Sequence, residues 1–597
     1  MASTDSGMRT LVHVTHEAVQ KVGGIGAVLQ GLITSKAYNQ QIDRTVLIGP
    51  LFTRDGSGQS RLGPDGEVFY SSVDGLVNHP TAPIWQEIQR AFKVDVVYGR
   101  RAFYEDATNF KAHAEVVLID VHRVDFRRLN EFKADLFTHF GIESNRYEDA
   151  WDYDQYVKLA GPAVEAIYGL GLPTGGECVL VAHEFMGMPA ALAAILRNHG
   201  SLRTAFYAHE VATVRKLVEE HPGHDTMFYN VMAEATAEGL YLEDMFGNQH
   251  HYFKHALVEA SRFCDNILAV GDYVIKELRF LDPDFDAVDI DLSYNGIPAF
   301  QITPEEAETS RQRLCQYCEN LLSYRPDYVF THVSRLAPSK GLWRDVRVLE
   351  HIEEAFRQTG KTGVCYFLNT ELPRRRPEDI YDMEDWWDWP VAHREGMPDL
   401  STGEAIFYAT VQRFNARSRN VKAVLVNQFG WEQALCGSRM PEQMEFWDIR
   451  KGADVEFGLS TYEPFGIAQL EALSVGGLCV ISNVCGCAGF VDDATGGQPS
   501  PNVIVADFTE IAKPRPPAQN LLTIDRKFRD AVENRVTRRV AEELLKRLPN
   551  SPADKGKLIE SGYDLASRMT WEVVARNYFL PAIDRALKKQ RLHEFAG

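Results

Sequence analysis

The sequence predicts an α/β protein built from two doubly wound domains. Short apolar runs alternate with amphipathic stretches along the 597 residues, which is typical of α/β folds. Many of these runs lack polar alternation, as expected for parallel strands covered on both faces. The runs form two successive sets, and a chain of this length exceeds a single hydrophobic core. We therefore expect domains at residues 1–300 and 301–568, with the boundary near the YNGIP sequence at 294–298.

The apolar runs define the expected strands of each domain. In the first domain these are 10–15, 45–48, 94–98, 116–121, 178–182, 204–208 and 267–270. In the second domain they are 328–333, 364–368, 423–426, 455–459, 478–482 and 503–506. Residues 373–401 are charged and rich in Trp and Pro, and they read as an insertion in the second domain.

Composition restricts the partners. The formal net charge of −20 disfavours nucleic acid and anionic membranes. No apolar run reaches the length of a membrane span, and the N-terminus lacks the pattern of a signal peptide. Most of the nine cysteines lie in apolar runs, which indicates reduced thiols. We expect a cytoplasmic protein without nucleic-acid or membrane partners, and the sequence leaves open whether it forms a homo-oligomer.

Two groups of residues resemble metal ligands only superficially. Cys315 and Cys318 have zinc-site spacing, but the nearest second pair, Cys485 and Cys487, has a shorter spacer and no flanking histidine. His250, His251 and His255 (sequence HHYFKH) could share one helix face, but no acidic residue within that stretch completes a ligand set. The sequence therefore predicts no metal site.

The segment STYEPFGIAQLEALSVGG at 460–477 carries two carboxylates, Glu463 and Glu471. A strand at 455–459 should precede it, and a helix from Gln469 to Ser474 should place Glu471 about two turns inside. A carboxylate, a helix N-terminus and a second carboxylate would then surround one small volume suited to a nucleotide sugar. The segment resembles the E-x7-E motif of retaining glycosyltransferases with the GT-B fold. The resemblance implies two Rossmann-like domains facing across a cleft.

A glycine-rich turn follows the first expected strand, in the sequence KVGGIGAV at 21–28. Gly23 and Gly24 would let a phosphate or sugar approach the backbone, and the following helix would offer unpaired N–H groups. An ordinary tight turn explains the glycines equally well. The turn resembles the K-x-G-G motif of glycogen and starch synthases, which implies that Lys21, Gly23 and Gly24 border the donor. Many bacterial members of that family have an aspartate where this chain has Ala27.

The sequence SRLAPSKG at 334–341 follows the first strand of the second domain. Arg335 and Lys340 should lie at the carboxyl end of that sheet, where open α/β sheets bind ligands. Arginine can fork two oxygens and lysine supplies a point charge, so the pair suits a diphosphate, although solvated side chains are the simpler explanation. The spacing resembles the S-R-L-x-x-x-K-G motif of the same family.

Two histidines end strands of the first domain. His209 in FYAHEVA resembles the strand-end histidine of glycogen synthases that contacts the transferred glucose. The sequence VAHEFMG at 181–187 resembles an H-x-H-E-W stretch of eukaryotic-type members, with Phe185 in place of tryptophan. His183 and Glu184 thereby become candidates for acceptor binding, with a structural role as the alternative.

The resemblance implies a retaining transfer of glucose from UDP-glucose or ADP-glucose to an α-1,4-glucan. Arg335 and Lys340 would stabilise the departing diphosphate, and Glu463 and Glu471 would recognise hydroxyl groups. Backbone amides near the turn would help, and these belong to Phe465, Gly466 and Ile467. Since cationic side chains neutralise the diphosphate, neither a metal nor another cofactor is expected.

Other functions remain open at this point. One is a sucrose-synthase-like transferase with a small acceptor, because E-x7-E is widely shared; another is a sugar phosphorylase; a third is a non-catalytic glycan-binding protein. The C-terminal segment 569–597 is amphipathic with one proline, and the resemblance implies a helix that packs back onto the first domain.

Overall fold

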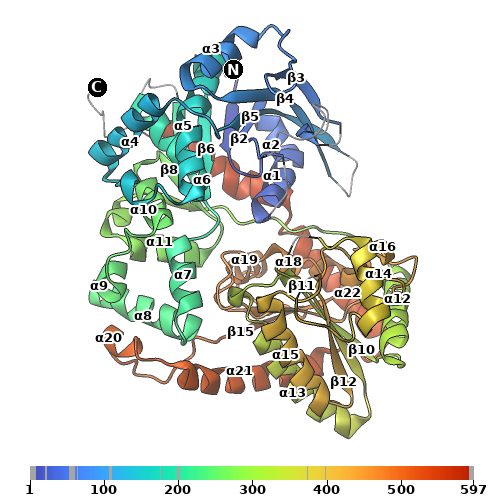
Figure 1. Ribbon diagram of the computed structural model, residues 1–597. Coiled ribbons are helices and arrows are strands. Elements are labelled where there is room, and N and C mark those ends of the chain that lie inside the picture. Colours follow the sequence, from blue (N-terminus) through green and yellow to red (C-terminus); the bar gives the residue numbers. More distant parts are fainter. Residues whose placement is uncertain are drawn as a thin grey trace, which may run out of the picture. The chain divides into compact units, whose positions relative to one another are not determined.

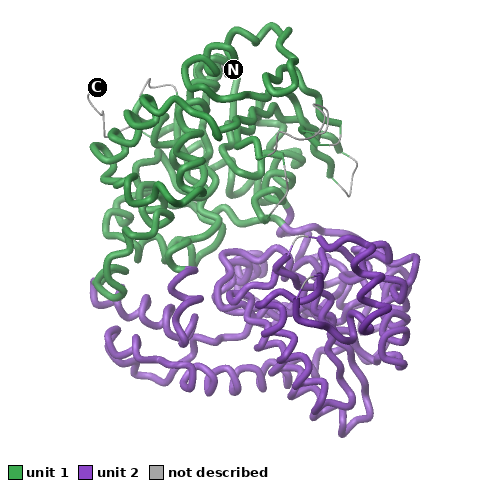
Figure 2. The backbone as a smooth tube through the Cα atoms, viewed as in Figure 1, with its two compact units in different colours: residues 1–214, 240–296, 571–597 green, residues 215–239, 297–570 purple. Residues whose placement is uncertain are grey.

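The computed structural model describes residues 8–19, 23–52, 61–63, 65–105, 110–174, 176–197, 202–372, 374–396 and 398–589. The chain forms two compact units (Figure 2): unit 1 comprises residues 1–214, 240–296 and 571–597, and unit 2 comprises residues 215–239 and 297–570. The α/β class with two doubly wound sheets is confirmed. Residues 215–239 differ from expectation, because they belong to unit 2 and not to the unit that precedes and follows them in sequence.

Among the described residues, unit 1 contains a nine-stranded sheet in the order β3-β4-β5-β2-β1-β6-β7-β8-β9 (Figure 1). Its strands are β1 (Thr10–Val14), β2 (Arg44–Pro50), β3 (Glu67–Ser71), β4 (Asp95–Tyr104), β5 (Lys111–Asp120), β6 (Cys178–His183), β7 (Leu202–Ala208), β8 (Asn266–Ala269) and β9 (Ile290–Leu292). The pairs from β5 through β2, β1, β6 and β7 to β9 are parallel, whereas β4 is antiparallel to β3 and β5.

Helices cover this sheet and join its strands. Those of unit 1 are α1 (Gly24–Thr34), α2 (Lys36–Gln41), α3 (Ala82–Phe92), α4 (Phe126–Phe140), α5 (Trp151–Gly169), α6 (Glu184–Arg197), α9 (Leu242–Phe246), α10 (Phe253–Glu259) and α11 (Asp272–Leu281). Helix α7 (Ala212–Glu220) begins in unit 1 and continues into unit 2.

In the described part of unit 2, six parallel strands form a sheet in the order β12-β11-β10-β13-β14-β15. These are β10 (Tyr328–Arg335), β11 (Gly363–Thr370), β12 (Val421–Val426), β13 (Val455–Gly458), β14 (Leu478–Ser482) and β15 (Val503–Ala506). The helices of unit 2 are α8 (His224–Glu238), α12 (Pro304–Leu322), α13 (Leu342–Thr359), α14 (Pro377–Trp387), α15 (Thr402–Arg417), α16 (Gln433–Cys436), α17 (Asp448–Lys451), α18 (Ile467–Leu470), α19 (Gly486–Thr495), α20 (Ala518–Leu521), α21 (Arg526–Arg547) and α22 (Pro552–Ser567).

Two apolar cores lie on opposite faces of the unit 2 sheet. Helices α13, α15 and α21 contribute buried side chains to one core, including Leu349, Val411 and Val536. Helices α12 and α14 contribute to the other, including Leu314 and Met383. Coverage of both faces explains why the strands of this unit read as continuous apolar runs.

The C-terminal segment belongs to unit 1. It consists of α23 (Trp571–Val574), a π-helical turn at Ala575–Phe579 and α24 (Leu580–Lys588). Phe579 stacks on His13 of β1 at a centroid distance of 6.4 Å, and Asn266 of β8 donates to the Ala582 carbonyl at 2.9 Å. The segment thus packs on the strands that carry the histidines described below.

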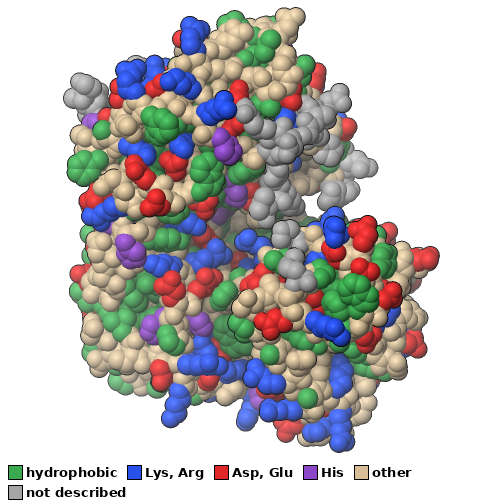
Figure 3. Space-filling view, in the orientation of Figure 1, with side chains coloured by type: hydrophobic (Ala, Val, Ile, Leu, Met, Phe, Trp, Pro, Cys, Tyr) green, Lys and Arg blue, Asp and Glu red, His purple; other side chains and the backbone are tan. Residues whose placement is uncertain are grey.

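The cysteines, the helices and the charged side chains can be compared with what the composition predicts. All nine cysteines are buried free thiols, as expected. Within the described ranges, no helix is both long and apolar enough to cross a bilayer. Acidic and basic side chains are interspersed on the face drawn in Figure 3.

Candidate active site

Lys340 and Glu463 form an ion pair at the carboxyl ends of two neighbouring strands of unit 2. Lys340 ends the short turn after β10, and Glu463 lies in the loop after β13, which pairs in parallel with β10. Their side chains are 16% and 14% exposed, so the pair is largely shielded yet reachable from solvent. The structure therefore brings together two predicted site residues from separate motifs.

The loops that carry this pair are interlocked through their backbones. The carbonyl of Ser339 accepts the N–H of Thr461 at 2.7 Å. Gly341 has a φ of +64°, and a Cβ there would lie 2.4 Å from the carbonyl oxygen of Leu459. Only glycine combines that conformation with such a close approach. The final glycine of the SRLAPSKG motif thus allows the two loops to meet.

The turn at Gly466 leads directly into α18. Gly466 has a φ of +96°, and its neighbours Phe465 and Ile467 are buried and half-buried. The expected helix from Gln469 to Ser474 is wrong in extent: α18 covers only Ile467–Leu470, and a 3-10 turn follows at Leu473–Val475. Gly476, with a φ of +79°, ends this segment just before β14, which leaves no room for a second α-helical turn.

Glu471 consequently caps a single helical turn and does not lie two turns inside a helix. Its carboxylate pairs with the Arg450 guanidinium at 2.5 Å, and Arg450 also pairs with Glu456 at 2.7 Å. Burial opposes the charge of Arg450, but the two carboxylates outweigh it and hold its pKa above the ordinary value. Arg450 was not identified from the sequence, where nothing distinguishes it from other arginines.

Arg335 stands at the exposed end of β10. Its side chain forms no ion pair with any residue that the structure describes. Unlike Lys340, it is therefore not held by a carboxylate of unit 2, and its charge remains accessible to a ligand.

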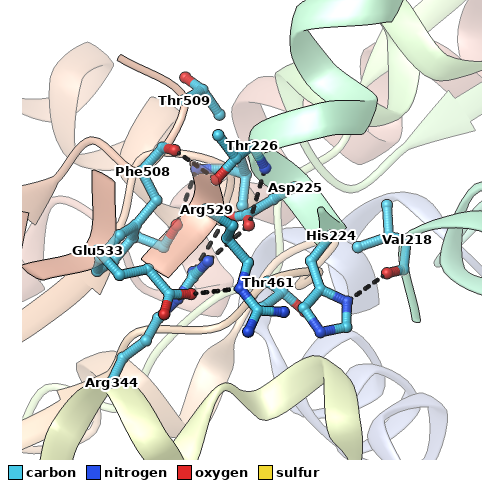
Figure 4. A network of polar contacts seen from close by, with 12 residues as sticks. Val218, His224, Asp225, Thr226, Arg344, Thr461, Phe508, Thr509, Arg529 and Glu533 are labelled. Atoms are coloured by element: carbon cyan, nitrogen blue, oxygen red, sulfur yellow. Dashed lines mark hydrogen bonds and ion pairs between the residues drawn. The ribbon is translucent and has the colours of Figure 1, made fainter. Parts of the chain in front are cut away.

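A buried network of charged side chains contacts the backbone of the loop after β13 (Figure 4). The guanidinium of Arg344, on α13, is fully buried and donates two hydrogen bonds to the carboxylate of Asp225 on α8, at 2.6 and 2.9 Å. Its Nε donates to Glu533 of α21 at 2.9 Å, and Nη1 donates to the carbonyl of Ser460 at 3.2 Å. Arg344 thereby connects α8 to the backbone just before Glu463. This also explains why residues 215–239 belong to unit 2.

In unit 1, three histidines form a continuous hydrogen-bonded chain. His13 Nδ1 lies 2.9 Å from His183 Nε2, and His183 Nδ1 lies 2.9 Å from His209 Nε2. The Tyr38 hydroxyl extends the chain, 3.2 Å from His13 Nε2 and 2.9 Å from the Thr45 hydroxyl. The sheet order β1-β6-β7 places the three histidines on adjacent strands or just beyond them. Two predicted residues meet here, and the sequence did not reveal His13 or Tyr38.

All three histidines are neutral near pH 7. Burial lowers the pKa of His13 and of His209 to about 3. Burial, together with the neighbouring histidines, lowers the pKa of His183 well below its ordinary value. When all three rings are neutral, each ring donates one hydrogen bond to one neighbour and accepts one from the other. If Tyr38 donates to His13, every hydrogen bond points from Tyr38 toward His209, and His209 has its N–H on Nδ1. If His13 donates to Tyr38, every hydrogen bond is reversed, and Nδ1 of His209 carries a lone pair.

We expect the histidine chain to make stability strongly pH-dependent. The unfolded state takes up protons on these histidines below about pH 6.5, whereas the folded state takes up protons on His13 and His209 only near pH 3. Stability is therefore complete above pH 6.5 and falls as the pH drops through that window, by about 1.4 kcal/mol per pH unit for each histidine. Urea midpoints at pH 7, 6 and 5 measure this. The His13→Gln variant should show a shallower slope, and an equal slope would contradict the assignment.

Glu184 has a strained backbone at the start of α6. Its φ is +58°, a conformation that costs a non-glycine residue about 1–3 kcal/mol. Its side chain is buried, and Oε1 accepts the N–H of Glu210 at 2.6 Å. Glu184 therefore holds the backbone beside His209, which is the kind of structural role that the sequence offered as the alternative to acceptor binding.

The glycine-rich turn differs from expectation. The carboxylate of Glu17 accepts the N–H groups of Gly23 at 3.0 Å and Gly26 at 2.9 Å, so the start of α1 is already satisfied by an internal anion. A phosphate at this place would have to displace Glu17. Gly24 has open space around its Cα, and Lys21 lies outside the described residues.

No protein-family model matches the sequence, and no curated protein matches it. Among solved structures, the chain is similar to the catalytic domain of starch synthase IV from Arabidopsis thaliana, bound to ADP and acarbose. The identity is 14%, the match covers 98% of this chain and 99% of that one, and the TM-score is 0.52. It is also similar to the N-terminal domain of trehalose-6-phosphate phosphatase from Candida albicans, at 12% identity, 98% coverage of each chain and a TM-score of 0.51. These similarities and the two predominantly parallel sheets establish that the chain has the GT-B fold, with two Rossmann-like halves.

Proposed function

We propose that this chain is a retaining glucosyltransferase that moves glucose from UDP-glucose or ADP-glucose to the end of an α-1,4-glucan. One observation carries the proposal: Lys340 and Glu463 meet at the carboxyl ends of adjacent parallel strands. Open α/β sheets bind their ligands at this edge. The pair supplies a cation for a diphosphate and a carboxylate for sugar hydroxyls.

In the proposed reaction, the bond between glucose and the diphosphate breaks first. Lys340 and the exposed Arg335 stabilise the charge that grows on the leaving phosphate, together with the amides around Gly466. The acceptor oxygen then bonds to the anomeric carbon from the face that the phosphate leaves. The departing phosphate oxygen takes the proton of the acceptor hydroxyl on that same face, so that configuration is retained. Glu463 binds glucose hydroxyls, and Glu471 binds the ribose of the nucleotide.

The proposal assigns contact with the transferred glucose to His209. Because His209 is neutral, its outer nitrogen makes a hydrogen bond without repelling a positively charged, oxocarbenium-like carbon. His13, His183 and Tyr38 would set which tautomer His209 presents. Gly23, Gly24 and Lys21 remain proposed donor contacts.

The direct test is incubation of the protein with each nucleotide sugar, with and without glycogen or maltooligosaccharides, followed by measurement of nucleotide release. Release that depends on a glucan supports the proposal. Release that depends only on a small sugar would transfer the assignment to the small-acceptor alternative. Release of glucose 1-phosphate from glucan and phosphate would identify a phosphorylase.

We expect transfer to need neither Mg²⁺ nor Mn²⁺, because Arg335 and Lys340 neutralise the diphosphate. After removal of both ions on a chelating resin, the rate should stay within about twofold of the rate measured with either ion added, since no transition-state charge donor is lost. Activity that returns only on addition of Mg²⁺ or Mn²⁺ would contradict this mechanism.

The three tryptophans of the insertion differ in how deeply they are buried. Trp389 is fully buried, and its indole N–H donates to Asn427 at 2.8 Å, so it packs the insertion onto unit 2. Trp387 is partly buried and donates to Asp399 at 2.9 Å. Trp386 is 63% exposed on α14 and is available to stack on a sugar face.

We therefore expect Trp386→Ala to weaken binding of glycogen severalfold while sparing turnover with a short maltooligosaccharide. A single stacking contact is worth about 0.5–1.5 kcal/mol. Trp151→Ala is the matched control, because Trp151 is 47% exposed in unit 1. An equal effect of the two variants on glycogen affinity would exclude Trp386 as a glucan contact.

A further inference from the structure

Glu243, His250 and His255 converge in unit 1 although they come from three different places. Glu243 lies on α9, His250 in the following loop and His255 on α10. One ligand atom from each lies within 4.8 Å of the others. The acidic residue that the histidine sequence itself lacks is supplied by α9, so the reason for excluding a metal here does not hold.

The distances from Glu243 to the two histidines are too long for hydrogen bonds. Glu243 Oε1 lies 3.7 Å from His250 Nε2 and 4.0 Å from His255 Nε2. A direct N–H···O bond requires about 2.7–3.2 Å. Two metal bonds of about 2.0–2.2 Å at a tetrahedral angle, in contrast, join ligand atoms about 3.4 Å apart. Small shifts of the three side chains would therefore let one cation at the centre of the cluster contact all three atoms.

The surroundings of the cluster orient its members toward that centre. The other ring nitrogen of His255, Nδ1, lies 3.1 Å from the hydroxyl of Thr213, which leaves Nε2 toward Glu243. The Tyr147 hydroxyl donates to the His250 carbonyl at 2.5 Å and fixes that loop. Metal-bound histidines commonly use their second nitrogen in this way.

A second carboxylate lies beside the cluster. Glu259 Oε2 lies 3.6 Å from His250 Nε2, and Oε1 of the same carboxylate pairs with Arg262 at 3.2 Å. His255 is only 2% exposed, so the cluster is closed to solvent on that side. Two imidazoles and two carboxylates thus lie around one centre.

We propose that Glu243, His250 and His255 bind a structural Zn²⁺ ion, with Glu259 as a further ligand or an outer hydrogen-bond partner. Two histidines and a carboxylate form an established donor set for this metal. The ion would join α9 and α10 to Thr213, in the first turn of α7. Since Thr213 lies four residues after His209, the metal would also stabilise the loop that carries His209.

The test uses the full-length protein without a histidine tag. After stripping with dipicolinate and gel filtration, Zn²⁺ is titrated in competition with a chromophoric chelator, and Co²⁺ is added in parallel to detect visible absorption from a four- or five-coordinate site. We expect one Zn²⁺ per chain and a higher melting temperature with Zn²⁺. His250→Ala and His255→Ala should each weaken Zn²⁺ binding by more than about 10-fold, since even loss of an outer partner costs 10–100-fold.

The neighbouring His251→Ala variant is the matched control and should bind Zn²⁺ like the wild type, because His251 is exposed and outside the cluster. Thr213→Val should reduce affinity through loss of the outer hydrogen bond alone. If His255→Ala does not fold, His250→Ala and the Co²⁺ spectrum of the wild type still decide. Equal Zn²⁺ affinity in the wild type and His250→Ala, or equally tight binding of Mg²⁺, would overturn the proposal.

Discussion

Replacing Glu463 by glutamine is expected to lower turnover by at least about 10²-fold while leaving unit 2 folded. Glutamine keeps the shape of the side chain but loses the charge that holds Lys340 and that, in the proposed reaction, binds glucose hydroxyls. Removal of one preorganised group at a reacting centre typically costs a factor of this size. The measurement is kcat and KM with saturating donor and glycogen.

Variants of two other carboxylates serve as a control and as a comparison for this experiment. Glu442→Gln is the matched control, because Glu442 is exposed in the same unit, and it should leave both constants unchanged. Glu471→Gln should raise KM for the nucleotide sugar more than it lowers kcat. The double variant of Lys340→Ala and Glu463→Gln should lose little more than either single variant if the pair acts as a unit. Turnover above half of the wild-type value in Glu463→Gln would remove this residue from the site.

The meeting of Lys340 and Glu463 was predictable from the sequence, for a simple reason. Each residue follows an apolar run that reads as a buried strand, and parallel strands place their carboxyl ends at one edge. Local pattern therefore sufficed for both strands and for the loops after them. Every expected strand is present, whereas the two omitted strands, β3 and β9, are short, partly exposed edge strands with little apolar signal.

The support of the site could not be predicted in the same way. His13 lies within a buried strand, where a histidine gives no sign of its partner, and only the order β1-β6-β7 brings it to His183. Arg344 and Asp225 lie 119 residues apart in sequence. Glu17 was missed because a carboxylate six residues before a glycine-rich turn has no distinctive pattern. Each of these contacts joins side chains that only the tertiary fold brings together, and no local pattern in a single sequence indicates such partners.

The largest effect on stability is expected from Asp225→Ala. Arg344 is completely buried, and this change removes one of its two carboxylates, leaving Glu533 as the remaining close partner. Breaking a buried ion pair on one side costs about 3–5 kcal/mol, because the other charge stays in the interior with less compensation. The urea midpoint of unit 2 should fall accordingly, and amide exchange in residues 215–239 should accelerate.

Glu234→Ala provides the matched control, because Glu234 lies on the same helix and pairs with Arg515 at 3.4 Å near the surface. Such an exposed pair contributes about 0–1 kcal/mol, so this variant should unfold nearly like the wild type. Asp225→Ala should also reduce turnover, because Arg344 holds the Ser460 carbonyl three residues before Glu463. Loss of stability with unchanged kcat would show that the network only stabilises the packing of α8 on the rest of unit 2. Equal unfolding of the two variants would show that the buried network is no stronger than a surface ion pair.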